Sequence, residues 1–197
     1  QSALLPHESG VSTLASPRRP ELAELVTDEK VSSVLSVLKE LNEYVVLDLP
    51  HDFSPTTLAA LDTADVILLV LQPEIISVRS AVMVLETFNT LGYDLNQIYL
   101  ILNWTFPRKG IATAEIEKSL QKKISLVIPY ATDELLEGLN YGTPPTYATP
   151  EEPIGVLFED LAMSVSKEEH RKRKPTDPSD AWTRVAKRIQ ERMKQKN

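Results

Sequence analysis

The sequence predicts an α/β fold with a partial, doubly wound parallel sheet. Its strand-length runs are apolar throughout instead of alternating, and a stretch with helical spacing separates each run from the next. Such runs are typical of parallel strands that helices cover on both faces. In this architecture ligands bind beyond the carboxyl ends of the strands, so the residues after each run are candidate site residues. The runs lie at residues 44–49, 65–73, 97–103 and 124–129.

The composition fits one such domain with a short appendage. The chain has 197 residues, of which 42% are hydrophobic and 25% charged, enough for a sizeable core. It contains no cysteine, which excludes disulfides, thiolate metal sites and cysteine nucleophiles. Its three histidines, His7, His51 and His170, lack the spacing of metal ligands. No apolar run approaches the roughly 20 residues that a membrane-spanning helix needs.

The amino-terminal elements are a short strand and a capped helix. Residues 11–16 form a strand candidate, which the turn-rich sequence PRRPE closes. Thr27 is a predicted helix N-cap, because acidic residues follow in the first turn and apolar residues then recur at helical spacing. These apolar residues are Val31, Val34, Leu35, Leu38 and Leu41.

Further helices are predicted between and after the long strands. Ser54 and Pro55 are typical of an N-cap and a first helical residue, so a helix is expected over residues 55–64. Another is expected over residues 78–91, where Gly92 ends it. The remaining helices are expected around residues 113–121, 132–140 and 154–165.

Asp48 stands at the end of the first long apolar run. A carboxylate in this position faces the ligand site of a parallel sheet, and its usual role there is to hold Mg²⁺ beside a triphosphate, directly or through water. Alternatively, Asp48 caps the next helix or binds loop amides. Asp48, His51 and Asp52 also suggest an acid–base cluster, but on a proline-containing turn these side chains need not converge, which favours a solvated loop.

Four segments carry a family resemblance: VSTLASPRRPELAELVT, YVVLDLPHDFSPTTLAALDTADVILLVLQPEIISVRSA, LILNW and VIPYATDELLEGLNYGTPP. Their order from about Gly10 to Val165 resembles the second half of a MinD/ParA-type P-loop ATPase. The CpaE/TadZ branch, which is associated with pilus assembly and polar localisation, is the most similar. The resemblance therefore implies a P-loop NTPase fold.

The resemblance also implies roles for individual residues. Asp48 matches the Mg²⁺-associated acid of the family, so it is the candidate catalytic and metal residue. Asn103 matches an asparagine beside the adenine, and the segment from Pro129 to Asp133 matches the lining of the base pocket. Asn103, Pro129 and Asp133 are therefore the candidate nucleotide-binding residues, with ATP and Mg²⁺ as the implied cofactors of the complete protein.

The chain departs from the family at the phosphate site. Phosphate binding needs a glycine-rich Walker A loop, whose backbone N–H groups point at the anion and whose lysine reaches the phosphates. The six glycines of this chain are isolated, and no such loop is present. Either the chain is the carboxyl-terminal part of a longer ATPase, which we favour, or it is a degenerate domain that keeps the scaffold without the chemistry. We expect no tight nucleotide binding and no activity from this chain alone.

These observations predict part of an ATP-dependent localisation switch, CpaE/TadZ-like in pilus assembly or polar positioning. The implied partners are a second copy of the complete protein, which dimerises around ATP, and proteins of the pilus or secretion machinery. The alternative is a non-catalytic, ATPase-like scaffold or partner-binding domain. The resemblance implies a cytoplasmic protein that is peripheral on the inner face of the bacterial membrane or at the pole.

A basic tail follows an acidic body. Residues 167–197 hold 11 Lys and Arg against 5 Asp and Glu, a net charge of +6, whereas the rest of the chain carries −13. We therefore divide the chain into an ATPase-like portion at 1–166, a charged linker at 167–180 and a basic amphipathic helix at 181–197.

The predicted tail helix has an apolar face with basic residues around it. Such a helix can lie in a membrane interface, dock in a partner's groove, bind back onto the acidic body or contact nucleic acid. The acidic body disfavours nucleic acid, because it repels a polyanion. The candidate membrane or partner contacts are Trp182, Val185, Ile189, Met193, Lys187 and Arg188.

Overall fold

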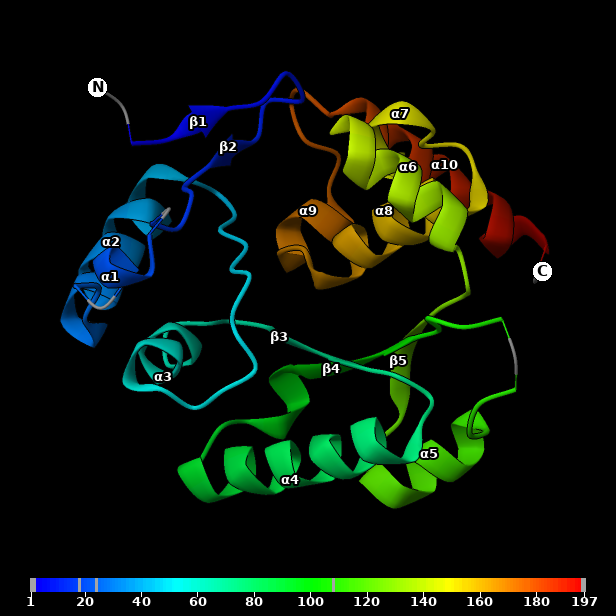
Figure 1. Ribbon diagram of the computed structural model, residues 1–197. Coiled ribbons are helices and arrows are strands. Elements are labelled where there is room, and N and C mark those ends of the chain that lie inside the picture. Colours follow the sequence, from blue (N-terminus) through cyan, green and yellow to red (C-terminus); the bar gives the residue numbers. More distant parts are fainter. Residues whose placement is uncertain (1–2, 18, 24, 108, 196–197) are drawn as a thin grey trace. The chain divides into compact units, whose positions relative to one another are not determined.

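The computed structural model describes residues 3–17, 19–23, 25–107 and 109–195. The chain forms two compact units, Gln1–Ile67 and Leu68–Asn197. Helices alternate with the strands of a sheet along the second unit (Figure 1), so the predicted α/β class is confirmed.

A small hairpin and a helix pair form the first unit. Two short strands pair antiparallel, with Leu5 opposite Thr13, and helix α2 packs against helix α3. The strand predicted at residues 11–16 is thus reduced to two paired residues, and a helical turn occupies part of the segment predicted as a turn. The elements are β1 (Leu5–Pro6), β2 (Ser12–Thr13), α1 (Pro20–Ala23), α2 (Asp28–Leu41) and α3 (Pro55–Leu61).

Helices α2 and α3 begin at the predicted N-caps. The Thr27 hydroxyl accepts a hydrogen bond from the backbone N–H of Lys30, and the Ser54 hydroxyl accepts one from the backbone N–H of Thr57, each at 3.4 Å. A side-chain oxygen in this position satisfies one of the helix's otherwise unpaired donors. Polar residues therefore fix where both helices start.

The first predicted long strand, residues 44–49, is not a strand in the structure. Its side chains alternate between exposed and half-buried with a period of two, as those of an extended chain do, and Val46 is 93% exposed. No described strand pairs with this segment. An extended segment becomes a strand only when its N–H and C=O groups meet those of a neighbour. The sequence supplies the strand pattern here, but the described chain supplies no partner.

The second unit is built on a sheet whose described strands have the order β3-β4-β5. β4 and β5 run parallel, and their register places Leu102 beside Val127 and Asn103 beside Ile128. The strands are β3 (Ile67–Leu71), β4 (Ile98–Asn103) and β5 (Ile124–Ile128), which confirms the strand predictions at residues 65–73, 97–103 and 124–129.

Helices lie on both sides of this sheet. In Figure 1, α4 and α5 lie on one side of the strands, and the group from α6 to α10 lies on the other. α4 packs against α5, while α8 packs against β5 and α10. The elements are α4 (Ile75–Leu91), the 3-10 turn η1 (Leu95–Gln97), α5 (Thr113–Leu120), α6 (Thr132–Tyr141), α7 (Pro145–Ala148), α8 (Pro153–Val165), α9 (Glu168–Lys172) and α10 (Asp180–Gln195).

The ends of α4 show which helix signals are reliable. The helix ends at Gly92, as predicted, because this residue takes the left-handed conformation at φ 82°, which favours glycine. It begins at Ile75, three residues before the predicted start at Val78. Ile75 and Ile76 are 55% and 72% exposed, so the spacing of buried residues does not mark the first turn.

β4 forms the centre of the core. Leu100 and Leu102 are completely buried, and Ile98 and Ile101 are 2% exposed. Side chains from both faces of the strand are thus covered, as its continuous apolar run predicts. Buried side chains of the surrounding elements include Leu71, Val78, Ala81, Phe88, Ile116 and Ile128.

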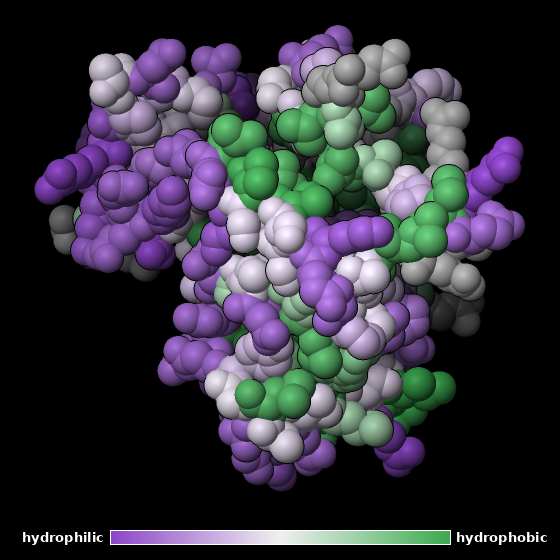
Figure 2. All heavy atoms as spheres, turned by 90° about the vertical axis from the view of Figure 1, so that its left-hand side faces the viewer, coloured by the Kyte–Doolittle hydropathy of each residue, from purple (hydrophilic) through white to green (hydrophobic). Residues whose placement is uncertain are grey.

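Apolar side chains also reach the surface, as the green areas of Figure 2 show. On β3, Leu68 is 41% exposed and Val70 is 57% exposed, although both belong to a continuous apolar run. β3 is an edge strand of the described sheet. One face of β3 is therefore only partly covered, unlike both faces of β4.

We expect Leu102→Ala to lower the free energy of unfolding by about 2–5 kcal/mol, because it leaves a cavity in the fully buried strand β4. Urea denaturation followed by circular dichroism measures the loss. The matched control is Leu139→Ala on α6, where the side chain is 77% exposed and the cost should stay near or below about 0.5 kcal/mol. Equal losses at the two positions would contradict the assignment of β4 to the core.

Candidate functional site

The carboxyl ends of β4 and β5 lie side by side. Asn103 is the last residue of β4 and pairs in register with Ile128, the last residue of β5. The backbone N–H of Trp104 donates to the carbonyl oxygen of Ile128 at 3.0 Å, and Pro129 follows at once. Asn103 is half-buried and Pro129 is exposed. The parallel register therefore brings these two predicted nucleotide-binding residues to one edge of the sheet.

The loop after β4 is tied to the end of β3. The backbone N–H of Ile111 donates to the carbonyl oxygen of Pro73 at 2.8 Å. Gly110 lies so close that a Cβ atom there would stand 2.5 Å from the same oxygen. On the other side of Pro73, the Ser77 hydroxyl accepts the backbone N–H of Gln72 at 2.8 Å. Gly110 is thus required for close packing of backbone on backbone at this edge.

An aromatic pair that was not predicted from the sequence lies beside Asn103. The ring centroids of Trp104 and Phe106 are 5.9 Å apart, with an angle of 63° between the planes. Both side chains are half-buried. Edge-to-face pairs of this kind hold each ring in place, and a fixed aromatic ring is a surface on which a base can stack. The signal in the sequence is WTF directly after Asn103.

Asp133 is exposed in the first turn of α6. An acidic side chain in a first turn interacts favourably with the helix dipole, and Glu134 occupies the same turn. This explains both residues without a ligand. The segment from Pro129 to Asp133 nevertheless leads directly from the end of β5 into α6, as expected for a segment that lines a site at the strand ends.

Asp48 and His51 belong to the first unit, and both are exposed. Asp52, in contrast, is engaged at the start of α3. Its Oδ1 accepts the Thr57 hydroxyl at 2.7 Å, and the hydroxyl and backbone N–H of Ser54 at 2.8 and 3.0 Å. These hydrogen bonds, above all the one from Thr57, hold the pKa of Asp52 below its ordinary value. Asp52 and Ser54 thus organise the helix start, which favours the structural interpretation of Asp52 over the acid–base cluster.

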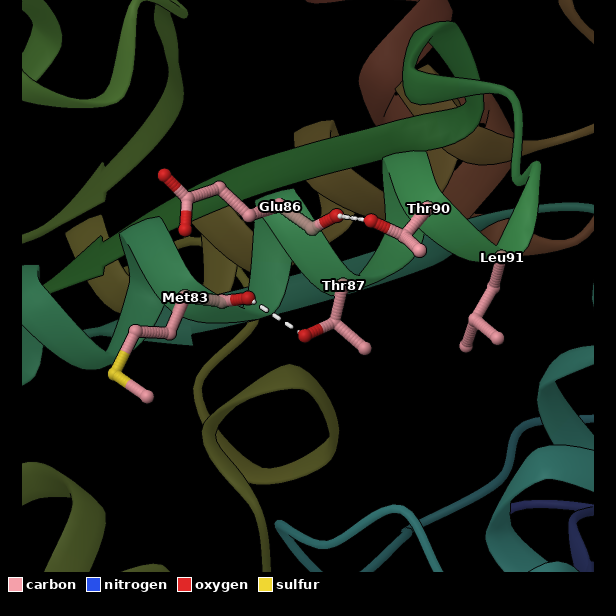
Figure 3. A pocket seen from close by; sticks show the side chains of 5 residues that line it. All are labelled: Met83, Glu86, Thr87, Thr90 and Leu91. Carbon is pink, nitrogen blue, oxygen red and sulfur yellow. Dashed lines mark hydrogen bonds between the residues drawn. The ribbon is translucent and has the colours of Figure 1, made fainter.

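A shallow hollow of about 280 Å³ lies along the exposed face of α4 (Figure 3). The Thr87 and Thr90 hydroxyls donate to the carbonyl oxygens of Met83 and Glu86 at 2.8 and 2.9 Å. Leu91 completes the lining. Both hydroxyls are therefore committed to their own helix, and the hollow offers a single carboxylate among apolar atoms. It brings together none of the predicted site residues.

The tail helix α10 lies against α8 through an arginine stripe. Arg184 Nε donates to Glu159 Oε1 at 3.0 Å. Arg188 Nη2 donates to Glu159 Oε2 and to Asp160 Oδ1, at 2.9 Å each, and Arg192 Nη2 donates to Asp160 Oδ2 at 2.7 Å. The arginines fall at positions i, i+4 and i+8 and so share one side of the helix. Of the four arrangements predicted as possible for the tail, the structure has the one in which it binds back onto the body.

This contact is charged and partly buried. The side chain of Glu159 is only 3% exposed, and those of Arg184 and Arg188 are 27% and 19% exposed. Val185 of α10 is buried beside the stripe, and Trp182 Nε1 donates to the carbonyl oxygen of His170 at 2.9 Å. A buried carboxylate requires such partners, since alone it would lose its hydration without compensation.

The other predicted contact residues of the tail lie further from α8. Ile189 is 39% exposed, Met193 is 63% exposed, and Lys187 is exposed. Val185 and Arg188, by contrast, face α8. The six predicted contact residues are thus divided between a docked side and a free side. Within the described part of the chain, no helix is both long enough and apolar enough to cross a membrane.

Two solved structures with a similar arrangement of elements are ATPases. The ParA family ATPase of Chlorobium tepidum matches with a TM-score of 0.74 at 22% identity, covering 81% of this chain and 66% of that one. The septum site-determining protein MinD of Pyrococcus horikoshii, solved with Mg-ADP, matches with a TM-score of 0.73 at 22% identity, covering 88% and 71%. The fold is that of the ParA/MinD ATPases.

Sequence comparison adds one relative with a named ligand. An uncharacterised ATP-binding protein of Methanocaldococcus jannaschii is 27% identical over 138 residues, which are 70% of this chain and 51% of that protein. The chain therefore spans about half the length of this curated relative. No protein-family model matches the sequence.

The predicted metal and base residues have the donor groups that Mg²⁺ and a base each need. The described residues contain no group of three or more His, Asp or Glu side chains placed to hold a metal ion. Mg²⁺ does not need a group of three such side chains, because it keeps several waters and binds one or two carboxylates together with substrate phosphates. An exposed carboxylate such as Asp48 fits that role, and Asn103 with Trp104 fits a base. The printed sequence has no glycine-rich loop for the phosphates.

We expect Gly110→Ala to destabilise the second unit by about 1–3 kcal/mol, because the added methyl group overlaps the carbonyl oxygen of Pro73. Thermal unfolding followed by near-ultraviolet circular dichroism measures the change. Lys109→Ala, at the exposed neighbouring position, is the control and should cost less than about 0.5 kcal/mol. A Gly110→Ala variant as stable as the parent would show that the loop does not need this close approach.

The docking of α10 should weaken in acid. Burial raises the pKa of Asp160, but hydrogen bonds from Arg192 and Arg188 outweigh it, and the net pKa lies below the ordinary value. A lowered pKa means that the contact is complete above the ordinary aspartate value of about 4 and is lost as the pH falls through the lowered one. Glu159 faces the same arginines.

The measurement is the difference in urea midpoint between the parent and Asp160→Asn as a function of pH. We expect a constant difference from about pH 7 to about pH 5 that shrinks below about pH 4. A difference that persists unchanged at about pH 3 would show that the charge of Asp160 does not hold the tail.

Proposed function

We propose that the chain is part of an ATP-dependent localisation switch whose nucleotide binds beyond the carboxyl ends of β4 and β5. The observation that carries the proposal is the meeting of Asn103 and Pro129 at one edge of a ParA/MinD-type sheet. Ligands of open parallel sheets bind at this edge. Support comes also from the Pyrococcus horikoshii MinD, solved with Mg-ADP, and from the ATP-binding Methanocaldococcus jannaschii relative.

Each predicted site residue contacts a different part of the nucleotide or its metal ion. Asn103 offers an amide that both donates to and accepts from the edge of a base, and Trp104 beside it offers a ring face. Asp48 would hold Mg²⁺, directly or through water, and the ion would compensate the charge of the phosphates. Hydrolysis of bound ATP would end the ATP-bound state and so reset the switch. The segment from Pro129 to Asp133 lines the base side of the site.

The partners follow from the same interpretation. The complete protein dimerises around ATP, and the CpaE/TadZ-like sequence pattern favours a place in pilus assembly or polar positioning. The tail contacts a membrane surface through the apolar face of its helix. On this face Ile189 and Met193 are exposed. The protein accordingly works in the cytoplasm and at the inner face of the membrane.

A non-catalytic scaffold is the second candidate function, and one observation favours it. The printed sequence lacks the glycine-rich loop that would cradle phosphates. A scaffold would keep the ParA/MinD fold and position its partners through surfaces such as the exposed face of α4. It predicts no MgATP binding by the natural full-length protein and localisation that survives Asp48→Ala.

We expect Asp48→Ala to weaken MgATP binding by the natural full-length protein about 10- to 100-fold, since it removes a charged partner of the metal. Binding measured by calorimetry in EDTA, without Mg²⁺, should be nearly the same for the variant and the parent. Asn103→Ala should weaken binding to a similar degree with and without Mg²⁺, because it acts on the base.

Glu86→Ala is the matched control, because it removes a carboxylate from the exposed face of α4 and should leave both affinities unchanged. Tight MgATP binding that survives Asp48→Ala and Asn103→Ala would overturn the proposed site. Absence of MgATP binding by the unaltered natural protein would instead favour the scaffold.

A further inference from the structure

We propose that α8 and α10 form a latch, in which Glu159 and Asp160 hold the arginine stripe of α10 and an anionic lipid surface opens it by competing for the same arginines. The inference rests on the membrane contact of the tail proposed above and adds its regulation. Arg184, Arg188 and Arg192 are the stripe.

Docking on α8 and lipid binding compete for donors of the arginine stripe. A guanidinium that is bound to a carboxylate at 2.7–3.1 Å has its donors directed at that carboxylate and its charge compensated. Lipid phosphates would compete for these donors. The N–H groups that Arg184 and Arg188 direct at Glu159 and Asp160 are not free to bind a phosphate until the helix leaves α8.

The contact is suited to release. Val185 is the buried side chain of α10, and the arginine stripe adds ion pairs to Glu159 and Asp160 of α8. A salt bridge that is removed from water gains little net stability, because the lost hydration of its charges offsets their attraction. Both partners regain water when the helix leaves, and Asp160 and Arg192 are already 24% and 59% exposed.

The exposed side of the docked helix α10 can make the first contact with an anionic membrane. Ile189 and Met193 reach solvent while the arginines are held. Lys187 and Lys194 lie seven residues apart and so share one side of the helix. This side flanks Ile189 and Met193 on the side away from the arginines. The docked tail thus presents apolar and basic groups together, which is the combination that attracts a helix to an anionic membrane interface. Full binding then draws the arginine flank away from α8.

Glu159 and Asp160 also determine how strongly anionic a lipid surface must be to open the latch. In the docked state two carboxylates compensate three guanidinium groups, so the surface attracts anions weakly. After release all three positive charges face the lipid, and the attraction of each cation adds to the binding. In a zwitterionic lipid a cation compensates each phosphate, so its surface carries no net negative charge and competes only weakly with Glu159 and Asp160. The latch therefore opens on lipid surfaces with a high density of negative charge and stays closed on neutral ones.

The test uses the whole chain with Trp104→Phe, which leaves Trp182 as the single tryptophan of the two in the sequence. The latch variant is Glu159→Gln with Asp160→Asn, which removes the charges at constant size. Glu168→Gln with Glu169→Gln is the control, because it removes two nearby charges on α9 that do not bind the stripe. The probes are vesicles of phosphatidylcholine alone and with phosphatidylglycerol, followed by sedimentation and by the emission of Trp182.

We expect the latch variant to bind the anionic vesicles at roughly a tenth of the lipid concentration that the parent needs, because further cations are freed. The emission of Trp182 in buffer should shift to the red, since release breaks its hydrogen bond to His170 and exposes the ring. The control should behave like the parent, and neutral vesicles should bind none of the proteins. Circular dichroism checks that each variant is folded.

A second variant separates the latch from the lipid contact. Arg184→Gln with Arg188→Gln should also release Trp182, but it lacks the cations and should bind anionic vesicles no better than the parent. Unchanged Trp182 emission in both variants would overturn the latch. Release without any gain in vesicle binding by the latch variant would overturn the opening by lipid and would leave only the docking of α10 on α8.

Nucleic acid is tested in the same assay. Double-stranded DNA at matched phosphate concentration should shift Trp182 far less than anionic vesicles do, because it offers no apolar interface for Ile189 and Met193. An equal shift would overturn the assignment of the opening ligand to lipid.

Discussion

The second unit depends on the pairing of β4 on both of its sides. Leu100 and Leu102 are removed from water completely, so the backbone N–H and C=O groups between them have no access to solvent and must be paired by flanking strands. β3 and β5 supply this pairing, and the parallel course of β4 and β5 aligns their carboxyl ends. Asn103, Pro129 and the Gly110 loop reach one edge of the sheet as a consequence. The candidate site thus lies at this edge because the buried strand β4 must be paired on both sides.

The same requirement explains where the sequence predicted correctly and where it did not. Residues 65–73, 97–103 and 124–129 became strands, because each has a neighbour in the described sheet. Residues 44–49 have an equally apolar composition and an alternating exposure, but no described neighbour, and they remain unpaired. Hydrophobic patterns report the fit of side chains to a strand. They do not report whether a partner strand is present, because that depends on chain far away in the sequence.

Local signals were the most accurate, because they are decided within a few residues. Thr27, Ser54 and Gly92 act at the positions predicted for them, each through its own side chain or its lack of one. The site was predicted less completely. The order of the strands places Asn103 beside Pro129, and this follows from a parallel sheet. The bonds of Asp52 to Ser54 and Thr57 depend on the turn of the backbone, and the sequence could not distinguish them from an acid–base cluster.

The tail shows why a charge count predicts the character of a surface but not its partner. A net charge of +6 over residues 167–197 identifies a basic segment, and the helical spacing identifies its apolar face. Glu159 and Asp160 are only two acids within the otherwise apolar pattern of α8, and nothing in their order along the chain marks them as partners of the stripe. The match arises because α10 lies where successive turns of one helix meet adjacent residues of the other. Since such pairs gain little once hydration is counted, the arrangement favours one docked geometry without making it permanent.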